Sequence, residues 1–382
     1  MSAKNKDKEM AALLEDLSSL SEEMTPPPGE KPSVGKRIGL FFGRVLCVLL
    51  VTVLLLVAGL YGVMYILTKG PSPTARDRFV LSVRETSAIG FLANLYLSDE
   101  EIEDIESGRT QEVFDETDAS LISIGTGSEE GTESNADAWG FVDEDGDGII
   151  LDVVKGEGYS GYMMIVLDPS RVIMGSVPEA FFYRGYTVEE MVQHFDAVAG
   201  TNAGGFEDPN GMGNGSEPDS AVVFNGTMYF GEKGTGNGFV GFDDQYILHV
   251  GLVGSRAVRE ANIQYGCSFG PVLVHNGEGV DPDSLASGIN PRTAIGQRSD
   301  GAVLLLVIDG RQVISLGATY ADLMEIMLRY GAVNACNLDG GSSSLMYYND
   351  HYVNNTASVI GIRPVPSSFI VLKEGARERD GY

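Results

Sequence analysis

Residues 222–230, Val-Val-Phe-Asn-Gly-Thr-Met-Tyr-Phe, carry the clearest indication of the fold, two short apolar arms joined by an Asn-Gly pair. Both central residues of a tight hairpin turn need a positive φ, so the segment predicts antiparallel strands at 222–224 and 228–230. The apolar run 272–275 is also followed by Asn-Gly, and the run 303–308 is followed by Asp-Gly. This pattern predicts a largely antiparallel sheet.

Two helices are expected among these strands. Residues 187–199 begin with a capping box formed by Thr187 and Glu190, and residues 319–330 carry a second apolar stripe that stops at Gly331. Many short strands with a few packed helices predict an α+β fold with a mixed, largely antiparallel sheet.

The N-terminal part contains an uncharged apolar run at 45–68. As a helix this run reaches roughly 36 Å, which is enough to cross the ~30 Å hydrocarbon core of a membrane. A long, mostly polar segment precedes it, unlike the start of a cleaved signal peptide, so we expect one uncleaved transmembrane helix. Because the C-terminal part is much the larger, we expect a single-pass protein of the cell membrane with an extracytoplasmic C-terminal domain.

The rest of the chain divides by composition. The first residues lack a sustained apolar face, the residues after the span show helical apolar spacing, and the next stretch is too acidic and polar to order itself. The expected parts are a disordered cytoplasmic tail at 1–44, the transmembrane helix at 45–68, a helical stalk at 69–105, an acidic linker at 106–138 and a strand-rich domain at 139–382.

The charge balance excludes one class of partner. The 382 residues include 54 acidic and 26 basic side chains, for a net charge of −28, and this field repels nucleic acid. The 3 cysteines and 4 histidines form no zinc-binding motif, and we expect no cofactor and no metal. Cys267 and Cys336 are compatible with a disulfide and equally with two buried thiols.

One acidic motif resembles half of a calcium loop. Asp143, Asp145 and Asp147 alternate and are followed by Gly148, but position twelve is Val154 instead of a bidentate Glu. We favour a plain acidic turn, and calcium binding stays open.

The most informative stretch is 337–344, Asn-Leu-Asp-Gly-Gly-Ser-Ser-Ser. A short apolar strand brings Asp339 to its tip, and two glycines then let the backbone turn with its N–H groups exposed. Together with the hydroxyls that follow, such a nest suits a phosphate or a sugar. A Gly-rich hairpin whose Asp caps its own turn explains the stretch equally well.

Three further segments have related chemistry. A guanidinium beside a hydroxyl suits bidentate binding of phosphate, and an amide beside glycines lets a ligand approach the backbone. The segments are Asn290-Pro-Arg292-Thr293-Ala-Ile-Gly296, Val307-Ile-Asp309-Gly-Arg311 and Thr201-Asn202-Ala-Gly204-Gly205-Phe206. For the second segment, a hairpin turn with a solvated ion pair is the alternative.

Taken in order, these segments and Ser268-Phe-Gly-Pro-Val-Leu-Val resemble the phosphodiester glycosidase family, over about 159–372. The chain departs from the family pattern in having Asn202-Ala-Gly-Gly where Asn-Gly-Gly is common, and a third Ser where Gly-Gly-Gly-Ser-Ser is frequent. The single anchor and the acidic linker resemble a bacterial envelope member.

The resemblance implies hydrolysis of a sugar-1-phosphodiester at the glycosidic bond, on an envelope or extracellular glycan. Phosphate is a good leaving group, so such a site needs positive charge and a carboxylate more than a general acid. The expected catalytic residues are Asp339, Arg292, Thr293 and Asp309. The expected substrate-binding residues are Asn202, Gly204, Gly205, Arg311, Asn337, Gly340, Gly341, Ser342 and Ser343.

In this scheme Arg292 and the N–H groups of Gly340 and Gly341 hold the phosphate, and Asp339 acts as nucleophile or as base. Two other functions stay open. One is a non-catalytic glycan-binding envelope protein. The other is a metal-dependent phosphodiesterase that uses Asp309, Asp339 and the acidic residues 143–147.

Overall fold

The computed structural model describes residues 34–86, 89–107, 114, 116–125, 137, 139–178, 181, 183–208, 212–229, 238–358 and 361–376. The chain forms two compact units, Met1–Met64 and Tyr65–Tyr382. Most of the tail expected at 1–44 and much of the linker expected at 106–138 therefore lie outside the described residues.

The long helix α2 spans Val34–Lys69. Its part from Ile38 to Lys69 is long and apolar enough to cross a membrane, by length and composition. Most of its large apolar side chains are exposed, with Met64 as an exception, as expected of a helix that faces lipid instead of a protein core.

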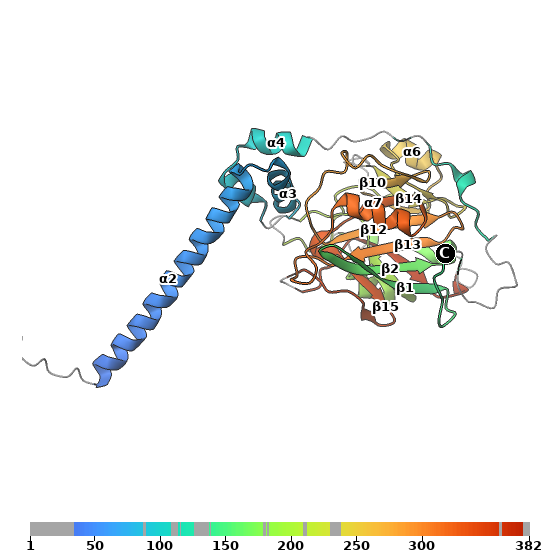
Figure 1. Cartoon of the computed structure of the whole chain (residues 1–382). Coiled ribbons are helices and arrows are strands. Elements are labelled where there is room, and N and C mark those ends of the chain that lie inside the picture. Colours follow the sequence, from blue (N-terminus) through green and yellow to red (C-terminus); the bar gives the residue numbers. More distant parts are fainter. Residues whose placement is uncertain are drawn as a thin grey trace, which may run out of the picture. The chain divides into compact units, whose positions relative to one another are not determined.

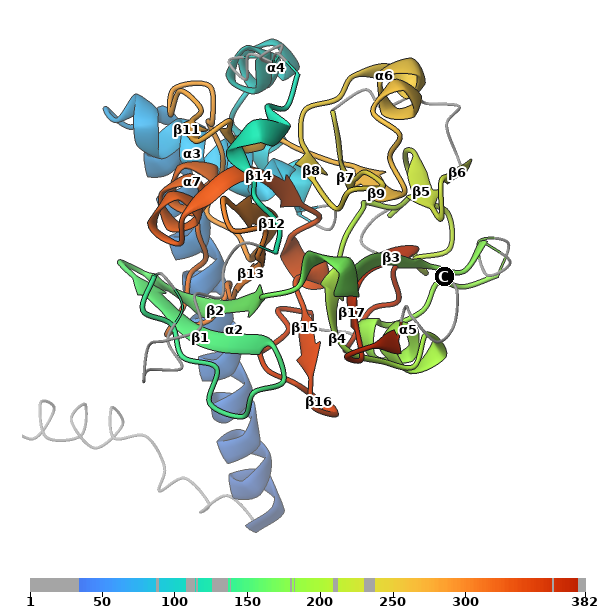
Figure 2. The ribbon, with the colours of Figure 1, turned by 90° about the vertical axis from the view of Figure 1, so that its right-hand side faces the viewer.

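The second unit is built from three sheets, and every strand pair among the described residues is antiparallel (Figures 1 and 2). The first sheet has the order β1 (Ile149–Gly156), β2 (Tyr159–Val166), β13 (Val303–Ile308), β12 (Arg292–Arg298), β14 (Ala332–Leu338), β10 (Val272–His275) and β11 (Glu278–Gly279). The second has the order β16 (His351–Tyr352), β15 (Met346–Tyr348), β4 (Ala197–Asn202), β17 (Ser367–Leu372) and β3 (Val172–Ser176). The third has the order β6 (Thr227–Tyr229), β5 (Val222–Phe224), β9 (Tyr265–Ser268), β7 (Phe239–Phe242) and β8 (Leu248–His249).

Helices precede, connect or cover these strands. They are α3 (Pro73–Arg84), α4 (Asp99–Ser107), α5 (Val188–His194), α6 (Gly254–Glu260) and α7 (Tyr320–Arg329), with 3-10 turns η1 (Gly90–Leu95), η2 (Ala119–Leu121), η3 (Pro169–Arg171) and η6 (Gly341–Ser343). Helix α7 lies against β10 and β14 (Figure 1). The α+β fold with a largely antiparallel sheet is thereby confirmed.

Both expected helices form, and α5 begins with the predicted capping box. The helix expected at 187–199 is shorter than predicted, however, because Asp196 takes a positive φ of 49° and β4 begins at the next residue. The apolar positions after His194 therefore belong to a turn and a strand.

One core connects the sheets. Buried apolar side chains from all three sheets and from α5 and α7 form a single cluster, and every residue of β13 is buried. Cys267 and Cys336 are both buried free thiols, so the disulfide is absent. Because β12 runs antiparallel to its neighbours β13 and β14, its first residues lie where both neighbours end.

Candidate active site

The predicted site residues meet at this edge of the first sheet. Thr293, near the start of β12, lies opposite Val307 of β13 on one side and Leu338 of β14 on the other. The residues that directly follow Val307-Ile308 and Leu338 are Asp309 and Asp339. Strand pairing alone therefore brings together segments that are far apart in the sequence.

Asn202, the last residue of β4, joins the second sheet to this edge. Its side chain is fully buried, and its Nδ2 donates to the backbone carbonyl of Asp339 at 2.6 Å. Its Oδ1 accepts from Thr293 Oγ1 at 2.9 Å and from the N–H of Leu345 at 3.2 Å. One amide thus fixes both the start of β12 and the turn after β14.

Asp339 is half-buried, and the turn that follows it contacts its carboxyl. It accepts hydrogen bonds from the Ser343 hydroxyl and the Gly340 N–H. Burial raises the pKa of Asp339 to about 7, and the charge of Asp219 adds to this rise, whereas the Ser343 hydrogen bond and Arg363 oppose it. A carboxyl with this pKa exchanges a proton near neutral pH, as an acid–base catalyst must.

Asp219 was not among the predicted site residues. Its N–H donates to the carbonyl of Gly205 at 3.2 Å, and a Cβ placed on Gly205 would lie 2.8 Å from Asp219 Oδ2. Glycine at 205 therefore lets this carboxylate approach the backbone. The neighbouring Gly204 is also packed tightly, since a Cβ placed on it would lie 3.2 Å from Ser367 Oγ, to which its N–H donates at 3.1 Å.

Arg363 is the second residue that sequence reasoning missed. It is 5% exposed and forms a two-pronged ion pair with Asp208, with N–O distances of 2.6 and 2.9 Å. Its Nη1 also donates to Ser342 Oγ at 3.1 Å, which ties the cation to the turn after Asp339. The chain has few basic residues, and this is the one feature of the sequence that could have drawn attention to Arg363.

Two further guanidinium groups are those of Arg292, the first residue of β12, and of Arg311, which follows β13 and donates to Asn290 Oδ1. Arg292 is buried, stacks 4.2 Å from the ring centre of Tyr320 and donates from Nε to the carbonyl of Ala318. Burial lowers the pKa of Arg311, and the nearby charge of Arg292 lowers it further. A Cβ on Gly341 would lie 3.5 Å from Arg311 Nη2, so this cationic pair borders the turn after Asp339.

The phosphate nest expected at Gly340 and Gly341 does not have free N–H groups. The N–H of Gly340 donates to the Asp339 carboxylate, and the N–H of Gly341 donates to the carbonyl of Pro291 at 2.9 Å. Gly341 has a positive φ of 61°, which explains the glycine at this position. Positive charge here comes from arginine side chains instead of the backbone.

Two predicted residues, Asp309 and Asn337, make their side-chain hydrogen bonds to other partners than Asn202, Thr293 and Asp339. Asp309 Oδ1 accepts from Asn354 Nδ2 and from the N–H of Asn355, both at 3.1 Å. Asn337 Nδ2 donates to the carbonyl of Gly270 at 2.8 Å, and its Oδ1 is buried with no hydrogen-bond partner.

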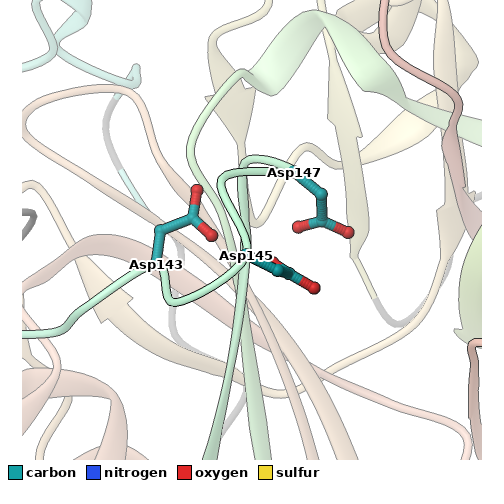
Figure 3. A group of neighbouring side chains, drawn as sticks. All are labelled: Asp143, Asp145 and Asp147. Carbon is teal, nitrogen blue, oxygen red and sulfur yellow. The ribbon is translucent and has the colours of Figure 1, made fainter.

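The acidic cluster of Asp143, Asp145 and Asp147 forms a turn of its own (Figure 3). One oxygen from each residue lies within 4.8 Å of the others, while Asp143 accepts from the N–H groups of Gly146 and Gly148. Neither Asp309 nor Asp339 belongs to a metal-sized cluster among the described residues. The carboxylates that a metal-dependent phosphodiesterase would combine are therefore not gathered at one place.

The fold and the site define an antiparallel α+β domain with a half-buried aspartate at a sheet edge bordered by arginines. Residues 195–372 match the phosphodiester glycosidase family, so the resemblance is confirmed over this part of the chain.

Solved structures extend the comparison. The catalytic domain of zebrafish N-acetylglucosamine-1-phosphodiester α-N-acetylglucosaminidase, auto-inhibited by its pro-peptide, is 19% identical, with a TM-score of 0.50 over 59% of this chain and 82% of that one. This likeness shows a shared fold. A putative exported protein from Burkholderia pseudomallei is 16% identical, with a TM-score of 0.44 over 56% of this chain and 74% of that one.

A curated relative matches only locally. The SPbeta prophage-derived uncharacterized protein YomE of Bacillus subtilis is 44% identical over 71 residues, which are 19% of this chain and 11% of that protein. The chain thus spans about a tenth of this relative's length.

Proposed function

We propose that this chain hydrolyses a sugar-1-phosphodiester at the glycosidic bond, on an envelope or extracellular glycan. The family match supports a phosphodiester-linked sugar as the substrate class. The observation that carries the proposal is the half-buried Asp339, whose carboxyl lies near Asp219 and Arg363 and has a pKa of about 7. The apolar helix α2 would anchor the protein as a single-pass membrane protein with this domain outside.

In the proposed reaction, water attacks the anomeric carbon, and the bond from that carbon to the phosphate oxygen breaks. The electron pair leaves with the phosphate, and the proton of the water passes to Asp339, which acts as general base. Arg292 and Arg311 would stabilise the charge on the departing phosphate. Asp219 would keep the pKa of Asp339 high enough for the carboxylate to accept a proton.

Hydrolysis in ¹⁸O-labelled water tests which bond breaks. We expect the full chain in detergent micelles, incubated with a panel of sugar-1-phosphate methyl diesters, to release unlabelled methyl phosphate, because water attacks carbon. Mass spectrometry of the released phosphate ester is the measurement. Label in that ester would show attack at phosphorus and would refute glycosidase action. Absence of turnover throughout the panel, with the panel bound, would favour a glycan-binding protein.

The pH dependence of kcat/KM tests whether the charge of Asp219 raises the pKa of Asp339. If Asp339 is the base, kcat/KM rises with pH through about 7, where its carboxyl loses the proton. Asp219→Asn removes a charge that raises this pKa, so the rise should move to lower pH. The matched control Asp244→Asn changes an exposed residue and should leave the profile in place. An unmoved profile in Asp219→Asn would contradict the proposed coupling.

A further inference from the structure

A segment just beyond the apolar helix lies against the cationic pair of the site. Glu85 follows the last residue of α3 and forms an ion pair with Arg292, with 2.8 Å between Oε2 and Nη2. The two residues are 207 positions apart in the sequence. The side chains are only 13% and 4% exposed, so the ion pair is shielded from water.

The donors around Glu85 match those that a phosphate group needs. Besides Arg292, Asn290 Nδ2 donates to Oε2 at 2.8 Å, and the N–H of Gly288 reaches Oε1 at 3.5 Å. A guanidinium, an amide and a backbone N–H thus converge on one anionic group, the donor types that bind phosphate oxygens. The second cation, Arg311, is close enough for Glu85 to affect its pKa.

Neighbouring residues fasten the same segment to the rim of the site. Ser82 Oγ accepts from the N–H of Ile289 at 2.9 Å, and Thr86 Oγ1 accepts from Arg311 Nη2 at 2.7 Å. A Cβ on Gly288 would lie 2.3 Å from the backbone of Ser82, so the two chain segments are in direct contact.

We propose that Arg292, Asn290 and Arg311 form an anion site whose built-in occupant is the Glu85 carboxylate, and that an anionic substrate enters by displacing residues 82–86. The segment is then an intramolecular competitor of the phosphate. This inference rests on the proposed function only in taking the anion to be the phosphate group of a sugar phosphodiester.

The affinity of the full chain for inorganic phosphate tests the proposal without requiring turnover. Glu85→Gln keeps the shape of the side chain but removes its charge, so the segment should leave the site more often. If the segment is docked about nine-tenths of the time, releasing it lowers the apparent Kd of phosphate about tenfold. Isothermal titration calorimetry in detergent micelles measures this change.

A second variant and a control separate competition from other effects. Gly288→Ala places a methyl group against Ser82 and leaves every charge in place, so it should also tighten phosphate binding. Glu106→Gln removes the exposed ion pair with Arg84 in the same region and should change nothing. Unchanged or weaker phosphate binding in both test variants, each folded by circular dichroism, would overturn the proposal.

Kinetics distinguish this inference from the proposed function. Turnover in the wild type, with no fall in KM in Glu85→Gln, would refute the competitor and leave the glycosidase standing. Tighter phosphate binding in both variants without turnover of any phosphodiester would establish the occupied anion site and refute the glycosidase.

Discussion

Replacing Asp339 with Asn is expected to lower kcat by about a thousandfold, within the range that general acid–base groups contribute. Asn is close in size to Asp and can accept the hydrogen bonds from Ser343 and Gly340, so the turn should keep its shape. What is lost is the group that takes the proton from water. Steady-state kinetics with a sugar-1-phosphodiester, together with calorimetric binding of inorganic phosphate, measure the two effects separately.

The same substitution separates an enzyme from a binding protein. Phosphate affinity should stay within a few-fold of the wild type, because the guanidinium groups remain. Asp168→Asn is a suitable control, since Asp168 is an exposed residue at the start of the turn η3 and should not affect turnover. Activity within tenfold of the wild type in Asp339→Asn would show that another group performs the proton transfer.

The second large effect concerns stability and pH. The pKa of Asp339 is raised from 3.8 to about 7, so the folded protein holds this proton more tightly than the unfolded chain does. The resulting stabilisation is complete below the ordinary carboxyl pKa and is lost as the pH rises through about 7. At pH 8 the folded chain must keep an ionised carboxylate at this half-buried position, which lowers its stability.

Asp339→Asn removes that cost. We expect the melting temperature of the variant to exceed that of the wild type at pH 8 and the difference to shrink at pH 5. Thermal unfolding of the full chain at the two pH values is the measurement. Equal differences at both pH values would show that burial does not raise the pKa of this carboxyl. A variant that is inactive but more stable than the wild type at high pH would show that Asp339 lowers stability while it serves activity.

Much of the fold and of the candidate site could be predicted from the sequence. The Asn-Gly pairs predicted the hairpins because turn chemistry is local, and the box of Thr187 and Glu190 predicted the start of α5 because its hydrogen bonds join residues three positions apart. Asp339 was placed at a strand tip by the apolar run before it. The helix predicted at 187–199 was too long, because a periodic pattern of apolar residues gives no indication of the positive φ at Asp196.

The sequence by itself determined the antiparallel α+β class, the apolar helix and the group of segments that carry Asp339, Arg292 and Asn202. Only the tertiary structure decided that Asp219 and Arg363 lie near that carboxyl and that Glu85 lies against Arg292. Arg363 pairs with Asp208 across 155 positions, and Glu85 pairs with Arg292 across 207. Turns and caps are set by neighbours along the chain, whereas ion pairs over such separations depend on how the sheets pack, and no local pattern encodes that.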